Sequence, residues 1–266
     1  YGTAEEDATM QLQHVEVVSD GPVARIVLNR PERRNALSLE LMREVIEALQ
    51  KLPDDVAVVV VEARGPAFSA GHDLSEMVSR DDAFYDELFA ACTEMMLALH
   101  ATPQPVIAKV HGVATAAGCQ LVAACDLAVA SEEATFATPG VKIGLFCSTP
   151  MVPVTRSIGR KRALQMLLTG EPIDAHTALD WGLVNRVVPA ADLDRAVDEL
   201  AAQITRFSPG VIALGKRAFY DQIERSEADA YACVSPVMAA NAAAPDAQAG
   251  ITAFLEKRTP HWPGRA

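Results

Sequence analysis

The sequence has no excess of basic residues and no apolar run of eighteen residues, and each absence removes a class of function. Its 35 Asp and Glu outnumber its 23 Lys and Arg, which gives a net charge of −12. A nucleic-acid surface needs clustered cations that outweigh local acids. A membrane span needs about twenty consecutive apolar residues. We therefore expect neither a nucleic-acid partner nor a membrane span.

Paired cysteine motifs are also missing. No two of the five cysteines form a CxxC pair, and no histidine cluster has metal-ligand spacing. The cysteines are Cys92, Cys119, Cys125, Cys147 and Cys233. An odd number of cysteines without a framework is typical of reduced thiols in a reducing compartment. We expect no metal site and no permanently bound cofactor. The expected location is the cytoplasm, or the mitochondrial matrix if a targeting segment has been removed.

The hydrophobic pattern predicts an α/β chain. Ser-Asp-Gly-Pro joins two β-branched runs into a hairpin, and Ser38 is placed to cap a helix. Strands then alternate with helices, and from residue 160 onward the pattern is almost wholly helical. The expected strands are 15–18, 23–28, 56–63, 106–110 and 127–130, with helices between them at 38–53, 83–99 and after 117. This order favours successive ββα-like units followed by a helical region.

Two segments of very small residues follow buried strands. FSAGHD (68–73) comes after strand 56–63, and TAAG (115–118) comes after strand 106–110. Because sequential strands tend to be neighbours, both segments are expected at one edge of the sheet. One backbone N–H from each, the second at a helix N-terminus, could then bind a carbonyl oxygen. The residues alone favour a plainer interpretation, in which 116–125 is a small-residue helix packed tightly on a sheet. A dinucleotide-binding loop is disfavoured, because the segment lacks the first two glycines of that motif.

Longer blocks resemble the enoyl-CoA hydratase/isomerase (crotonase) superfamily. They are RRNALS, AFSAGHDL, PVIAKVHGVATAAGCQLVAACDLAVASEEATFATPGVKIGL, LLTGEPIDAHTALDWGLVNRVV and GITAFLEKR, in the order and spacing of that family. FSAGHDL, FATPGV and GLFCSTP are typical of one subgroup within it. The resemblance implies a crotonase-like spiral of ββα units over residues 10–195 and a C-terminal helical trimerisation region over 196–266. It also implies assembly as a homotrimer or hexamer.

The resemblance further implies a ligand and its contacts. The ligand is an acyl-CoA thioester, with coenzyme A as part of the substrate. Its carbonyl oxygen is held by the backbone N–H groups of His72 and Ala117, which stabilise the enolate formed from it. The implied CoA contacts are Arg33, Arg34, Arg64 and Ala70, together with Phe254 and Lys257, which match positions that reach CoA bound to a neighbouring subunit. Each of these cations, taken alone, favours the interpretation as a solvated surface charge.

Two positions depart from the family pattern. Hydratases of the family carry two glutamates that share the reacting water, and Gln120 and Gly140 stand at those positions here. Glutamine cannot exchange a proton near neutral pH, and glycine has no side chain. In the following loop, Cys147 or Ser148 could react only if the thiol pKa is lowered or the hydroxyl is deprotonated. A packing role is the alternative for Cys147.

Three functions remain open from the sequence. The first is an enzyme of the enoyl-CoA hydratase/isomerase class, a lyase of fatty-acid metabolism by resemblance, whose proton transfer uses a nonstandard group or water. The second is an acyl-CoA-binding protein without chemistry, and the third is an isomerase or thioester hydrolase. The His72 imidazole can titrate near physiological pH, although a loop-capping role is at least as compatible with its place. Asp73 is expected to cap the short helix after it.

Overall fold

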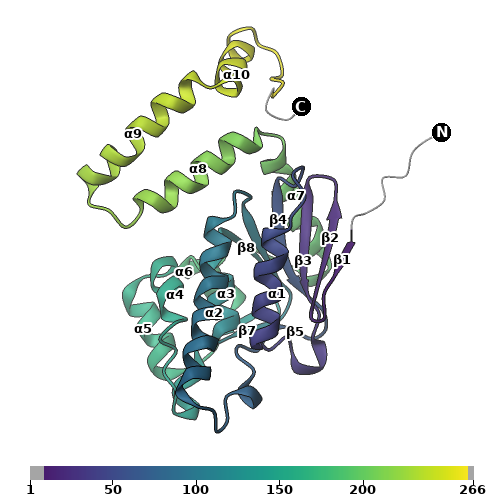
Figure 1. Cartoon of the computed structure of the whole chain (residues 1–266), viewed down its shortest axis with the longest axis vertical. Coiled ribbons are helices and arrows are strands. Elements are labelled where there is room, and N and C mark those ends of the chain that lie inside the picture. Colours follow the sequence, from purple (N-terminus) through teal and green to yellow (C-terminus); the bar gives the residue numbers. More distant parts are fainter. Residues whose placement is uncertain (1–8, 263–266) are drawn as a thin grey trace, which may run out of the picture.

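The computed structural model describes residues 9–262. A seven-stranded sheet forms the centre of the body, in the order β1-β2-β3-β4-β6-β8-β11 (Figure 1). The strands are β1 (Thr9–Gln11), β2 (Val15–Asp20), β3 (Val23–Leu28), β4 (Val58–Ala63), β6 (Val106–Val110), β8 (Leu127–Ser131) and β11 (Arg186–Val188). The β2–β3 hairpin is antiparallel, whereas β3, β4, β6, β8 and β11 run parallel. The expected hairpin and parallel α/β arrangement are confirmed.

A smaller four-stranded sheet follows the order β10-β9-β7-β5. Its strands are β5 (Ala67–Ser69), β7 (Val113–Thr115), β9 (Thr135–Ala137) and β10 (Ile173–Asp174). The chain therefore passes through β4–β5, β6–β7 and β8–β9 in turn, one strand in each sheet, and each pair precedes a helix. This repeat is the expected ββα spiral. Strands β5 and β7 were not among the expected strands, because three-residue strands are too short to show alternation.

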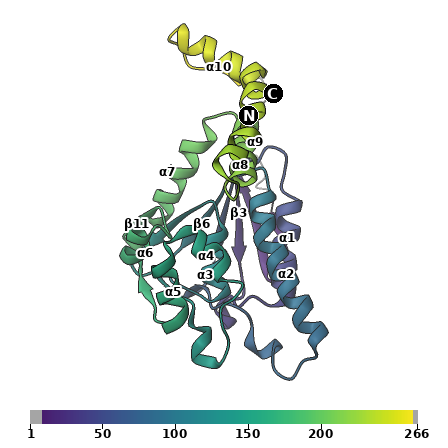
Figure 2. The same cartoon turned by 90° about the vertical axis from the view of Figure 1, so that its left-hand side faces the viewer.

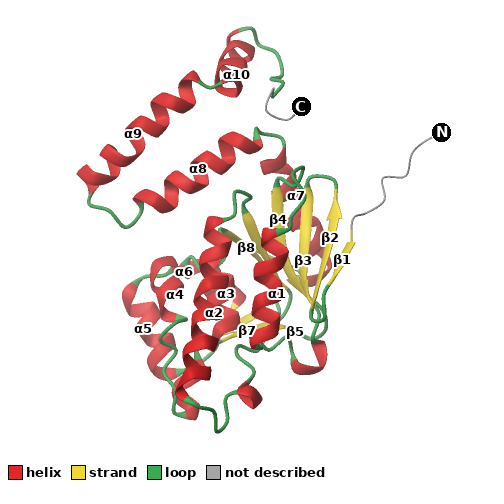
Figure 3. Cartoon of the chain, viewed as in Figure 1, coloured by secondary structure: helices red, strands yellow, loops and turns green. Residues whose placement is uncertain are grey.

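Six α-helices lie between β3 and β11 along the chain, and Figure 3 shows them beside the large sheet. They are α1 (Leu39–Gln50), α2 (Asp82–Ala101), α3 (Ala117–Ala124), α4 (Met151–Ser157), α5 (Arg160–Thr169) and α6 (Ala175–Trp181). The Ser38 hydroxyl accepts from the Leu41 N–H at 3.2 Å and caps α1 as expected. Strand β4 is buried on both faces, since Val59 packs toward these helices and Val58 toward the opposite side.

Four helices follow: α7 (Leu193–Thr205), α8 (Pro209–Gln222), α9 (Glu227–Ala243) and α10 (Pro245–Leu255). Helix α7 packs Leu193, Val197 and Ala201 on the second face of the large sheet. Helices α8–α10 form an arm that extends from the body (Figures 1 and 2). The expected boundary at residues 195 and 196 stays a prediction, and it falls within α7. Among residues 9–262, no helix has the length and apolar character that a bilayer crossing needs.

A buried polar cluster holds the arm to the body. The Lys216 ammonium of α8 donates to the carbonyl oxygens of Leu99 and Gln104 at 2.7 and 2.8 Å. It also lies 2.7 Å from the Asp126 carboxylate, which accepts from the Tyr220 hydroxyl at the same distance. The ammonium thus has three oxygen partners and is almost fully buried. This contact anchors α8, none of whose side chains is fully buried.

Four short 3₁₀ helices complete the described part, at Pro31–Arg33, Leu74–Glu76, Pro139–Ile143 and Ala190–Asp192. The Asp73 carboxylate accepts from the Ser75 N–H at 3.0 Å, so Asp73 caps the second of them as expected. It also pairs with the Arg30 guanidinium at 2.7 Å. Asp73 therefore fixes the loop that carries the neighbouring His72.

Candidate functional site

The two small-residue segments meet at the carboxyl end of the small sheet. Strands β5 and β7 are parallel neighbours, with Ser69 opposite Ala114. Gly71, just after β5, has φ +85°, and a Cβ added there would lie 3.2 Å from the Ala117 nitrogen and 2.9 Å from the Thr115 oxygen. Glycine alone combines this positive φ with so close an approach. The backbone at residue 71 thus lies against the start of α3.

Two backbone N–H groups at this contact are unused by the described chain. Leu37 donates its N–H to the Gly71 carbonyl at 2.7 Å and accepts from the Asp73 N–H at 3.2 Å. This bridge leaves the His72 N–H without an acceptor. Ala117 is the first residue of α3, where backbone N–H groups have no intrahelical partner. The positive end of the α3 dipole lies here as well, so the site combines two free donors with a favourable potential for a negative oxygen.

Close packing fixes the start of α3 on β5. A Cβ at Gly118 would lie 2.4 Å from the Ser69 carbonyl oxygen and 2.8 Å from the Ser69 Cβ. No side chain fits in that space. Ser69 is itself held, because its hydroxyl donates to the Asn35 carbonyl at 2.9 Å. The absence of a side chain at residue 118 therefore sets how close Ala117 comes to the loop of His72.

The His72 imidazole is half-buried beside these donors. Its ring meets the Phe89 ring of α2 edge to face, with centroids 5.4 Å apart. Both ring nitrogens are buried, and neither has a hydrogen-bond partner among residues 9–262. Burial lowers the pKa of His72, although the Leu37 carbonyl opposes this shift. Burial thus favours the neutral ring, and neither of its nitrogens makes a hydrogen bond of ordinary geometry within residues 9–262.

Gln120 lies one turn into α3 and is buried, with 3% of its surface exposed. The Cys92 thiol of α2 is 3.8 Å from the Gln120 Oε1 and donates a weak hydrogen bond to it. Burial raises the pKa of Cys92 to about 12, so this thiol keeps its proton. The position that the resemblance assigns to the first family glutamate therefore carries a neutral, hydrogen-bonded amide.

The second glutamate position is filled by another residue. A Cβ at Gly140 would lie 3.0 Å from the Cys147 Sγ and 3.0 Å from the Leu145 carbonyl oxygen. Cys147 is buried, and burial raises its pKa, opposed by the Gly140 backbone. The Ser148 hydroxyl is exposed and bonds only the Phe146 carbonyl, at 3.4 Å, within the described chain. This geometry offers nothing that activates either candidate nucleophile, and it gives Cys147 a packing role.

The structure brings four of the expected CoA contacts together. The Ala70 N–H donates to the Arg34 carbonyl at 3.0 Å. Asn35, the next residue, donates from its amide to the Arg64 carbonyl at 2.8 Å. Arg33 ends the adjacent 3₁₀ helix, and the three arginines are exposed. A group of cations thus lies next to the loop that leads to His72.

Phe254 and Lys257 are not brought to this place within one chain. Phe254 lies on α10 and is 82% exposed, and Lys257 follows the end of that helix with φ +56°. Figure 1 shows α10 at the far end of the arm, away from α3. Their expected contact with a neighbouring subunit stays a prediction. No group of three His, Cys, Asp or Glu within residues 9–262 is arranged to hold a metal ion.

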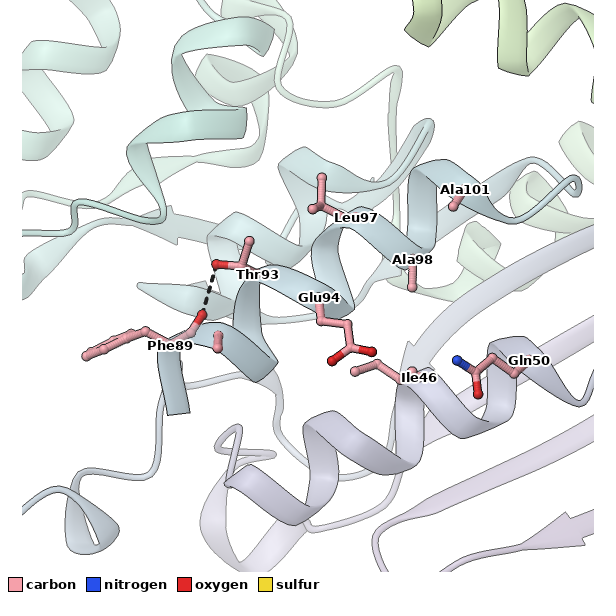
Figure 4. Close-up of a pocket in the computed structure, with 9 residues that line it drawn as sticks. Ile46, Gln50, Phe89, Thr93, Glu94, Leu97, Ala98 and Ala101 are labelled. Atoms are coloured by element: carbon pink, nitrogen blue, oxygen red, sulfur yellow. Dashed lines mark hydrogen bonds between the residues drawn. The ribbon is translucent and has the colours of Figure 1, made fainter. Parts of the chain in front are cut away.

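A separate groove of about 660 Å³ runs between α1 and α2. Figure 4 shows Ile46, Glu94 and Leu97 along it, with Phe89 at one end. Phe89 thus lies between the groove and the His72 ring. The sequence analysis did not single out Phe89 or Cys92 as site residues. Their spacing of three on α2 is the signal that could have placed them on one helix face.

Thr138 is a further residue that the sequence analysis missed. It follows β9, and its hydroxyl is buried without a hydrogen-bond partner among the described residues. The preceding Ala137 carbonyl accepts from the Ala116 N–H at 2.9 Å. The hydroxyl therefore belongs to the same sheet edge as the two free amides, on the side opposite β5.

Comparisons with known proteins agree with this architecture. The family model of enoyl-CoA hydratase/isomerase matches residues 19–265. The chain is 47% identical to the human mitochondrial enoyl-CoA hydratase domain-containing protein 3 over 243 residues, 90% of this chain and 80% of that protein. The frog Xenopus laevis protein of the same name is 45% identical over 262 residues, 96% of this chain and 89% of its own. This is the subgroup that FSAGHDL and GLFCSTP indicate, and the resemblance is confirmed.

Solved structures give the same result. An enoyl-CoA hydratase from Mycobacterium smegmatis superposes with a TM-score of 0.92 at 47% identity, covering 94% of this chain and 99% of that one. The human enoyl-CoA hydratase domain-containing protein 3 gives a TM-score of 0.92 at 44% identity, with 94% and 100% covered. The expected crotonase-like fold is therefore confirmed. On the sequence blocks, the ββα spiral and these matches together, the chain belongs to the enoyl-CoA hydratase/isomerase family.

Proposed function

We propose that the chain binds an acyl-CoA thioester and holds its carbonyl oxygen with the backbone N–H groups of His72 and Ala117. One observation carries the proposal: both N–H groups are unused by residues 9–262, and the start of α3 lies against the loop of His72. A preformed donor of this kind typically contributes about 2.7–4 kcal/mol to a transition state that carries negative charge on oxygen. The site therefore favours the enolate over the neutral thioester.

The cations next to the site support coenzyme A as the carrier. Arg33, Arg34 and Arg64 are exposed near Ala70, at the outer end of the loop that leads to His72. Guanidinium groups suit phosphate oxygens because they donate paired hydrogen bonds. CoA would enter as part of the substrate and leave with the product.

Hydration through two carboxylates is not the reaction that this site supports. Gln120 is a neutral amide bonded by the Cys92 thiol, and the space beside Gly140 is filled by Cys147. Each missing acid–base group typically costs a factor of about 10² to 10⁴ in rate. This favours a second candidate, an acyl-CoA-binding protein without hydratase activity. An isomerase or a thioester hydrolase needs the carbonyl oxygen to be bound in the same way and is a further alternative.

Calorimetry and an absorbance assay test the proposal together. Butyryl-CoA is titrated into the protein beside free CoA, and crotonyl-CoA is followed by its enoyl absorbance. We expect butyryl-CoA to bind more tightly than CoA, and crotonyl-CoA to be hydrated slowly or not at all. Equal affinity for butyryl-CoA and CoA would contradict the binding of the carbonyl oxygen by the two N–H groups. Rapid hydration would contradict the roles given to Gln120 and Gly140.

We also propose a homotrimer or a hexamer of two trimers. Helices α9 and α10 expose Tyr231, Met238, Phe254 and Leu255, each at least 66%. An arm with so much apolar surface is stabilised when it packs on another copy. Light scattering that gives a monomer mass would contradict this.

As to location, the human and frog relatives are named mitochondrial, which supports the mitochondrial alternative over the cytoplasm.

A further inference from the structure

Four titratable side chains lie around the two free amides or the two glutamate positions. Three are thiols: Cys92 bonds Gln120, Cys147 lies beside Gly140, and Cys119 follows Gly118 in α3. Burial raises the pKa of Cys92 and of Cys119 to about 12 and also raises that of Cys147. All three thiols are therefore protonated and are poor bases at neutral pH. The fourth is His72.

The His72 ring has what the thiols lack, which is nitrogens available for a hydrogen bond and a place beside one of the two amides. Both ring nitrogens are buried without a partner among residues 9–262. A buried polar group left unpaired costs about 1–3 kcal/mol, so such groups are retained where a ligand or a water completes them. Phe89 and Cys92 are three residues apart on one face of α2 and contact His72 and Gln120 respectively. The imidazole thus lies close to the place where relatives of this fold carry their first glutamate.

We infer that the imidazole of His72 is the base that removes and returns the proton on the carbon next to the thioester carbonyl, while its own backbone N–H holds the carbonyl oxygen. This inference rests on the proposed function. The C–H bond breaks, its electron pair forms the C=C bond of the enolate, and the oxygen takes the negative charge between the two amides. The proton moves to the free ring nitrogen. The reverse step restores the thioester, and no other reactant is needed.

The surroundings of the ring suit this role. Its neighbours are the Phe89 ring of α2 and the backbone carbonyl of Leu37, and no charged side chain of the described residues contributes to its titration. Burial keeps the ring neutral at pH 7, ready to accept a proton. The ring belongs to the same residue as one oxyanion donor, which places it in the neighbourhood of the bound carbonyl.

Deuterium exchange measures this step without any product. Butyryl-CoA is incubated with the whole protein in D₂O, and uptake of deuterium at the carbon next to the carbonyl is followed by mass spectrometry. The variants are His72→Gln, which keeps a polar side chain, and the matched control His176→Gln on the exposed surface of α6. We expect wild type and His176→Gln to exchange at the same rate. His72→Gln should lose about 10² to 10⁴ in rate, with affinity for butyryl-CoA unchanged within about threefold because the backbone donor survives.

The pH profile gives a second readout. The wild-type rate should be flat above pH 7 and should fall below pH 6.5, because protonation removes the base and its pKa lies below the usual value. If His72→Gln does not fold, His72→Phe fills the same apolar position beside Phe89 and takes its place in the assay. Exchange that survives in the His72 variant overturns the inference, as does wild-type protein that binds butyryl-CoA without exchange. Wild-type protein that binds no butyryl-CoA overturns the proposed function itself.

Discussion

Gly118→Ala perturbs the proposed site without touching any side chain in it. The added Cβ would lie 2.4 Å from the Ser69 carbonyl oxygen, about 1.0 Å short of ordinary contact, and 2.9 Å from the Ser69 carbonyl carbon. The Ser69 backbone is held in β5, so the start of α3 must move away from it. Extra carbon in a packed interior costs about 1–3 kcal/mol of unfolding free energy. A shift of about 1 Å in a positioned group can cost a factor of 10² in rate.

The assay separates misplacement from unfolding. We expect Gly118→Ala to remain folded by circular dichroism at 25 °C, to lose thermal stability, and to bind butyryl-CoA no better than free CoA. Gly215→Ala is the matched control, because a Cβ there meets nothing within 4 Å and lies in the interior of α8. That change should leave binding unaltered and stabilise the helix by about 0.5–1 kcal/mol. A Gly118→Ala protein that binds butyryl-CoA as wild type does would refute the geometry.

The remaining predictions concern chemistry, the arm and pH. Gln120→Glu alone should not restore hydration of crotonyl-CoA, because Gly140 still supplies no second carboxylate. Gly140→Glu should lower the free energy of unfolding by about 1–3 kcal/mol, because its side chain overpacks the space beside Cys147. Lys216→Met should cost about 3–5 kcal/mol in urea unfolding, because it leaves the largely shielded Asp126 carboxylate without its cation. Burial lowers the pKa of His72, so the unfolded chain binds more protons below pH 6.5, and Tm should fall from pH 7 to pH 5.

Each of these has a control or a contradicting result. Lys51→Met removes an exposed ion pair with Glu47 one turn away, and it should cost only about 0.3–0.5 kcal/mol. An equal loss in Lys51→Met and Lys216→Met would show that the buried cluster does not anchor α8. His72→Phe should reduce the fall in Tm between pH 7 and pH 5, and an unchanged fall would assign it to other groups, among them His100, whose pKa burial also lowers. Hydration restored by Gln120→Glu alone would contradict the need for two carboxylates.

The sequence predicted the larger elements well because long apolar stretches have a clear period. Strand 106–110 and helices α1 and α2 lie where their patterns placed them, and Ser38 and Asp73 cap the helices that follow them. The small sheet was missed because strands of three residues are too short to show alternation. Its strands exist through pairing with one another, which is a tertiary effect.

The candidate site was predicted in part. The small residues around Gly71 and Gly118 indicated a close backbone approach, and the structure shows what they approach. The sequence could not show that both nitrogens of the His72 ring are buried, because Phe89 and the Leu37 backbone reach the ring from other elements. Nor could it show that Cys147 fills the space beside Gly140, since a contact from a 3₁₀ helix to the loop after it has no sequence period.

The carbonyl stretch of a bound thioester tests the central claim most directly. Butyryl-CoA labelled with ¹³C at the carbonyl carbon allows that one vibration to be read in an infrared difference spectrum. If the N–H groups of His72 and Ala117 both donate to the oxygen, the C=O bond weakens and its stretch moves to lower frequency on binding. An unshifted frequency in the bound state would show that the two amides do not hold the acyl oxygen.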